Sequence, residues 1–138
     1  AGDEITAQID QAAGVSATAL LRQFVELWAN NLIGSDYGAG SPILAAAVGS
    51  GPDEQQLTSV AAEIFRGWRD AAQGAYMRDG FTQSDAKALA HTTIAALEGA
   101  VALCRSTQSL EPLTDVAAQL EFLITAREFV AKFGITAP

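Results

Sequence analysis

The chain has 138 residues, 49% of them hydrophobic and 17% charged, and 8 Lys and Arg against 16 Asp and Glu give it a net charge of −8. This length suits one domain with its own core, and the composition excludes a disordered chain. The chain has no apolar run of about 18 residues, which excludes a transmembrane helix. The acidity, with no basic stripe to offset it, predicts that these residues alone do not bind nucleic acid, because phosphates repel them.

The spacing of apolar residues predicts an all-α fold, an antiparallel bundle of about five to six helices in one domain over residues 1–138. Apolar positions recur three and four residues apart, and the alternating Val, Ile and Thr runs typical of strands are absent. Two helices are expected first, one beginning at Asp3 and one over about residues 18–33. The break between them lies near Gly14, and Ser16 can cap the second helix.

A loop rich in glycine and serine follows over residues 34–42. Ser41 is expected to cap a short helix that has Pro42 as its first residue and ends at Val48, because proline fits the first turn of a helix. After a second break, Asp53 is the expected N-cap of a long helix that runs to about Arg78. Its inward side should hold Leu57, Val60, Ala61, Ile64, Phe65, Trp68, Ala72 and Met77.

The next helix should begin at Thr82 or Ser84 and run to about Arg105, followed by a polar turn over residues 106–109. It is apolar or small nearly all round, so most of it should be buried. Pro112 opens the last helix, and Gly134 ends it. Phe122, Phe129 and Phe133 add a second apolar edge to that helix.

No motif for catalysis or metal binding is present. The chain lacks the nucleophile-elbow, phosphate-loop, dinucleotide-binding and zinc-protease patterns, so we predict no enzyme and no cofactor. One histidine, His91, and one cysteine, Cys104, cannot build a structural zinc site or a disulfide. Cys104 is expected to be a small buried apolar residue, and a single unpaired cysteine favours the reducing cytoplasm.

Glu98 stands in the middle of an apolar helical run, where a buried carboxylate would need a partner. Either it is exposed or structurally paired, or it lines a ligand cavity or a subunit interface. The aromatic residues Phe24, Trp28, Phe65 and Trp68 leave a similar choice, since core packing and the wall of an apolar pocket use the same residue types.

The chain resembles the C-terminal domain of TetR-type transcriptional repressors of the LmrA/YxaF-like branch. The resemblance rests on segments 24–32, 35–37, 40–42, 95–105, 109–113 and 116–117. Ser41 stands where a cysteine is common in this branch, which removes any thiol role there. The resemblance implies that a helix-turn-helix DNA-binding domain precedes residue 1, and that operator DNA is bound only through that domain.

The resemblance also implies a small-molecule effector and a homodimer in which the last two long helices of each protomer form a four-helix bundle. A largely apolar effector is expected in a cavity whose walls include Phe24, Trp28, Leu44, Phe65, Trp68, Ile94 and Glu98. The expected dimer interface combines small residues with a few larger ones, namely Ala88, Thr92, Ala95, Ala96, Gly99, Leu103, Leu120, Leu123 and Arg127. The alternative function is a stand-alone helical protein-interaction or small-molecule carrier module with no link to DNA.

Overall fold

The computed structural model describes residues 16–49 and 54–134, which form five α-helices and no strand. They are α2 (Ala17–Gly34), α3 (Pro42–Val48), α4 (Glu54–Arg78), α5 (Gln83–Thr107) and α6 (Glu111–Phe133). The all-α prediction is therefore confirmed. The helix expected from Asp3 and the expected N-cap Asp53 lie outside the described residues.

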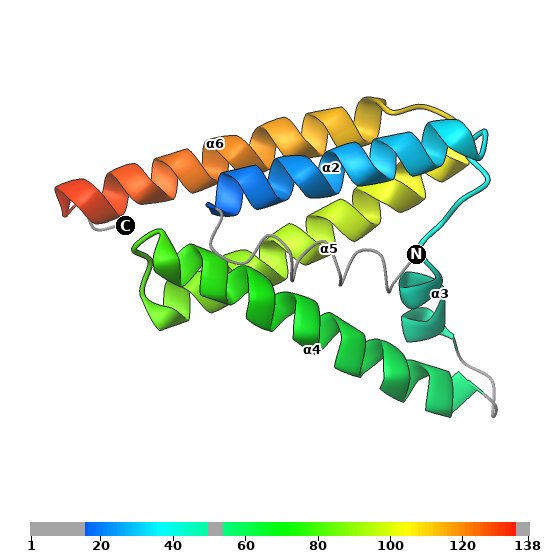
Figure 1. The fold of residues 1–138 in the computed structure, drawn as a ribbon, viewed down its shortest axis with the longest axis horizontal. Coiled ribbons are helices and arrows are strands. Elements are labelled where there is room, and N and C mark those ends of the chain that lie inside the picture. The colour runs from blue at the N-terminus through cyan, green and yellow to red at the C-terminus, as the bar shows by residue number, and fades with distance from the viewer. Residues whose placement is uncertain (1–15, 50–53, 135–138) are drawn as a thin grey trace.

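Helix α5 is the centre of the bundle, with α4 packed on one side and α6 on another (Figure 1). Helix α2 lies alongside α6 and also touches α5 and α4. The short helix α3 packs against the N-terminal half of α4, which diverges from the rest of the bundle (Figure 1). Among the described helices, none has the length and apolar character needed to span a membrane.

Three predicted N-caps are present. Ser16, Ser41 and Thr82 have extended backbones, and their hydroxyl oxygens accept hydrogen bonds from backbone N–H groups in the first turns of α2, α3 and α5. Each cap satisfies a donor that has no partner within its own helix, which is why short polar residues stop the chain at these points. Asp79 adds a tertiary cap, since its Oδ2 accepts from the Ala17 N–H at 2.9 Å.

The polar turn expected over residues 106–109 begins later than predicted, because α5 continues to Thr107. The hydroxyls of Ser106 and Thr107 donate to the Leu103 carbonyl, so these residues complete the last helical turn. Gln108, in the left-handed conformation with φ 52°, ends the helix. Helix α6 starts at Glu111, one residue before Pro112, and Gly134 ends it as expected, with φ 66°.

The core lies where α2, α4, α5 and α6 meet. Its most deeply buried large side chains include Trp28, Leu32, Tyr76, Val101 and Ile124. Cys104 is buried as predicted. A buried polar contact joins α4 to α5: the Tyr76 hydroxyl donates to Thr93 Oγ1 at 2.6 Å, because the Thr93 hydroxyl hydrogen is used on the Leu89 carbonyl.

Part of the inward side predicted for α4 was wrong. Leu57, Val60 and Met77 are exposed, with 54%, 48% and 45% of their surface accessible. Leu57 and Val60 belong to the N-terminal half of α4, and Figure 1 shows this half diverging from α2 and α6. Ala61 and Trp68, farther along the same helix, are buried as expected.

Candidate functional site

A narrow apolar cavity of about 50 Å³ lies between α2, α4 and α5, and we call it the inner cavity. Phe24 from α2, Trp68 from α4 and Leu97 from α5 form much of its wall. Its polar groups are few and include the bonded pair Tyr76 and Thr93. In this structure the inner cavity has room for roughly three to five water molecules, so it is not by itself a drug-sized site.

A larger and more open space of about 520 Å³ lies between α3, α4 and α5, and we call it the outer chamber. Leu44, Phe65 and Ile94 supply apolar surface from the three helices, and Ala95 and Gly99 form part of the α5 wall. This volume falls within the range of about 300–1,000 Å³ that is common for small-molecule sites.

Glu98 lies on the wall shared by the two spaces, together with Ile94. It is only 3% exposed, and neither carboxylate oxygen has a hydrogen-bond partner among the described residues. Burial raises the pKa of Glu98 above the ordinary glutamate value of 4.5, and the nearby Ser41 hydroxyl, which favours the charged form, offsets part of this rise. An unpaired carboxyl group this well buried is costly unless it stays protonated or meets a partner.

The cavity residues predicted from the sequence are divided between the two spaces. Phe24 and Trp68 line the inner cavity, Leu44 and Phe65 line the outer chamber, and Ile94 and Glu98 line both. That any of them binds a ligand stays a prediction.

Trp28, by contrast, lines neither space. It is 1% exposed and packs in the core, with its ring centroid 6.4 Å from that of Phe24. The sequence could not separate these two residues, because they are one helical turn apart on the same side of α2.

Several site residues were not foreseen. Tyr76 and Thr93 come together only through the packing of α4 against α5, and no local pattern in the sequence marks such a pair. Arg66, Arg69 and His91 line the outer chamber. The spacing of apolar residues predicts the helix that carries Arg66 and Arg69. It does not indicate that the outer chamber lies beside them.

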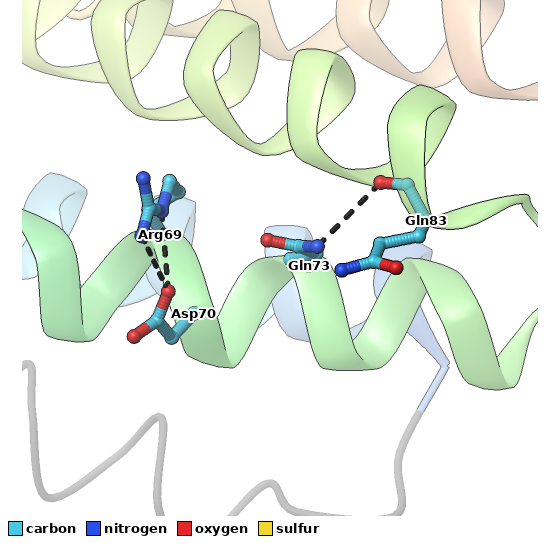
Figure 2. Close-up of polar contacts among 4 residues, drawn as sticks. All are labelled: Arg69, Asp70, Gln73 and Gln83. Carbon is cyan, nitrogen blue, oxygen red and sulfur yellow. Dashed lines mark hydrogen bonds and ion pairs between the residues drawn. The ribbon is translucent and has the colours of Figure 1, made fainter.

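The positive charge beside the outer chamber is partly compensated. Figure 2 shows Arg69 turned to Asp70, whose Oδ1 accepts from Nη2 at 2.9 Å and from Nε at 3.2 Å. One turn farther along α4, the Gln73 amide donates to the Gln83 carbonyl at the start of α5 (Figure 2). Arg66 and His91 are exposed to solvent. The site thus combines a buried acidic group with basic groups at its open edge.

The buried carboxyl group should make stability depend on pH. A carboxyl whose folded pKa is raised above its unfolded value costs stability as pH rises from the unfolded pKa through the folded one. We expect Glu98→Gln to remove this cost, so that the variant and the wild type unfold at similar urea concentrations near pH 5 and the variant becomes the more stable by pH 8. Urea unfolding followed by circular dichroism measures the difference, and a gap that does not widen with pH would contradict burial of a titrating carboxyl.

The predicted interface residues differ in exposure. Ala88, Thr92, Ala95 and Gly99 are exposed along one side of α5, and Leu103 is 53% exposed at the end of that side. Ala96 and Leu123 are half-buried against the core.

Two predicted interface residues already have contacts within the protomer. Leu120 is 5% exposed, so its side chain is a core residue of α6 and is not available to a partner. Arg127 forms an ion pair with Asp85, Nη2 to Oδ1 at 2.8 Å, which joins the C-terminal half of α6 to the first turn of α5.

The most exposed apolar surface of α6 is aromatic. Phe122, Phe129 and Phe133 have 72%, 53% and 60% of their surface accessible. Their spacings of seven and four residues place them on one side of the helix, opposite the buried Leu120 and Ile124.

Comparison with known proteins indicates the family of the chain. The model of a family described as "Transcriptional regulator LmrA/YxaF-like, C-terminal domain" matches residues 17–119. Two curated relatives are named as uncharacterized HTH-type transcriptional regulators of Mycobacterium tuberculosis, from strains CDC 1551 and H37Rv; each is 33% identical over 131 residues, covering 91% of this chain and 66% of the relative. The chain therefore spans just under two thirds of the length of these relatives. No solved structure matches the chain significantly.

Proposed function

The chain belongs to the LmrA/YxaF-like family of TetR-type transcriptional regulators, whose C-terminal domain it matches, and on that premise we propose that it is the ligand-sensing and dimerisation part of a repressor. In this proposal a small, largely apolar effector binds at the inner cavity and outer chamber. The observation that supports it most is Glu98, a buried carboxyl group without a hydrogen-bond partner among the described residues, on the wall that the two spaces share. A core that served packing alone would gain by an apolar residue there.

The proposed dimer pairs α5 and α6 of one protomer with the same helices of a second copy. Three phenylalanines of α6 expose apolar surface of the kind that obligate interfaces bury. Gly99 of α5 supports close approach, since a Cβ at this position would meet no atom within 4 Å in the protomer. A glycine inside a helix costs about 1 kcal/mol relative to alanine, and a neighbouring chain at this point would explain it.

The cavity and the proposed interface share part of one helix. Ala95 and Gly99 line the outer chamber and also lie on the exposed side of α5 that we assign to the dimer. An effector in the outer chamber would therefore touch the segment that pairs with the second protomer. This gives ligand binding a direct route to the relative placement of two protomers, and so to the spacing of two DNA-binding domains.

The DNA-binding step is proposed for the intact protein. The relatives named as HTH-type regulators are longer than the segment that matches this chain, and the chain carries a net charge of −8. We propose that a helix-turn-helix domain outside these residues contacts operator DNA, and that the regulator acts in the cytoplasm.

The test is an electrophoretic shift assay on DNA from upstream of the gene that encodes this chain. We expect the full-length protein to shift this DNA at low salt, and the 138-residue chain alone not to shift it, because its acidic surface repels phosphates. A specific shift by the chain alone, or none by the full-length protein, would contradict the proposal.

A further inference from the structure

Glu98 is a residue of a charged type that is buried without an ion pair in the described part of the chain. No ion pair or hydrogen bond to its carboxylate occurs within the described part of the chain. The charged groups of the outer chamber are engaged elsewhere or exposed: Arg69 is held by Asp70 (Figure 2), and Arg66 and His91 lie at the solvent edge. Residues 16–49 and 54–134 therefore supply no positively charged partner for this carboxylate, and the Ser41 hydroxyl is the polar group that approaches it.

The surroundings of Glu98 suit a positive charge carried on an apolar body. Leu44 and Phe65 face the outer chamber from α3 and α4, and Ile94 lies one turn before Glu98 on α5. Phe65 packs edge-on against Trp68, with ring centroids 5.4 Å apart, so aromatic surface extends from the outer chamber to the inner cavity. Aromatic rings attract cations in addition to providing apolar contact.

We propose that the effector is a hydrophobic amine in its protonated form, with its nitrogen against the Glu98 carboxylate and its hydrocarbon part in the outer chamber between Leu44 and Phe65. This inference rests on the proposed ligand-sensing function and specifies the ligand class. An anionic ligand would be repelled by the ionised Glu98 carboxylate. A neutral ligand would leave the negative charge of that carboxylate uncompensated.

Binding of the amine is coupled to a proton. Burial raises the pKa of Glu98, so the free protein keeps this carboxyl proton to a higher pH than an exposed glutamate would. When the ammonium group pairs with the carboxylate, the carboxyl proton leaves to solvent, and the amine keeps its own. Affinity for the amine should therefore rise with pH in the range where Glu98 titrates. The other titratable, charged or hydroxyl-bearing groups that face these spaces or Glu98 are Ser41, Arg66, Arg69, Tyr76, His91 and Thr93.

The experiment compares three probes with the same hydrocarbon skeleton on the full-length protein: 4-phenylbutylamine, 4-phenylbutan-1-ol and 4-phenylbutanoate. Binding is followed by tryptophan fluorescence, since Trp68 lines the inner cavity, and by thermal shift. We expect the amine to bind about tenfold or more tightly than the alcohol, and the carboxylate to bind most weakly. Amine affinity should rise from about pH 5.5 to about pH 8, while the amine itself stays protonated.

Glu98→Gln should lower amine affinity to that of the alcohol and remove its pH dependence. Alcohol binding by the variant shows that the cavity is still folded. Glu63→Gln, an exposed site on α4 that lines neither space, is the matched control and should behave as wild type.

The outcomes separate this inference from the proposed function. Equal binding of amine and alcohol, or undiminished amine binding by the Glu98→Gln variant, would overturn the amine proposal and leave an apolar effector site standing. A failure of all three probes to change fluorescence or melting temperature would contradict the ligand site itself.

Discussion

A protein that carries both Phe122→Glu and Phe129→Glu is expected to be a monomer at micromolar concentration, where the wild type is expected to be a dimer. The two side chains are 72% and 53% exposed in the protomer, so the changes should not disturb its core. In the proposed interface each new carboxylate would be buried without a partner, at a cost of about 3–5 kcal/mol. That cost is a large part of the binding free energy of an ordinary dimer.

Size-exclusion chromatography with light scattering measures the mass, and far-ultraviolet circular dichroism checks that the helices remain. Leu57→Glu provides the matched control. Leu57 is also an exposed apolar residue, at 54%, but lies on α4 away from the proposed interface, so its variant should stay dimeric. A double Phe variant that keeps the dimer mass would move the interface away from this side of α6.

Trp28→Ala is expected to lower the free energy of unfolding by about 3–5 kcal/mol, because it removes one of the largest buried side chains and leaves a cavity among α2 and its neighbours. A loss of this size is comparable with the whole stability of many domains. Urea unfolding followed by circular dichroism, with Trp68 as the remaining fluorophore, measures it.

Phe24→Ala is the informative comparison for Trp28. Phe24 is only partly buried and lines the inner cavity, so this change should cost less stability than Trp28→Ala. If Trp28→Ala were nearly neutral for stability but abolished probe binding, Trp28 would be a ligand-wall residue, contrary to its place in the structure.

Local signals in the sequence were sufficient for most boundaries of the described helices. Ser16, Ser41, Thr82 and Gly134 act at their own chain positions, where the cap satisfies backbone groups within the next or previous turn. The boundary that was misplaced, after Arg105, depended on whether Ser106 and Thr107 would bond back to the helix. Polar residues favour both a turn and a terminal helical turn, so composition alone could not decide it.

The family could also be predicted from the sequence, because the order and spacing of the apolar segments in this chain carry the resemblance. The comparison with the family model confirmed that resemblance. The candidate site could be predicted from the sequence only in part. Periodicity indicated that Glu98 and Ile94 share a helix with apolar neighbours, but the burial of Glu98 depends on α2, α3 and α4 closing around it.

What only the tertiary structure decided is which side of each helix meets which neighbour. The 3.6-residue period places Phe122 and Leu120 on opposite sides of α6, and both residues are apolar, so the sequence allowed either one to face the core. The packing of α6 against α5 and α2 buries Leu120 and leaves Phe122 exposed. In the same way Trp28 became core and Phe24 became cavity wall, because burial is a property of the surrounding helices and is not encoded in the residue type or its spacing.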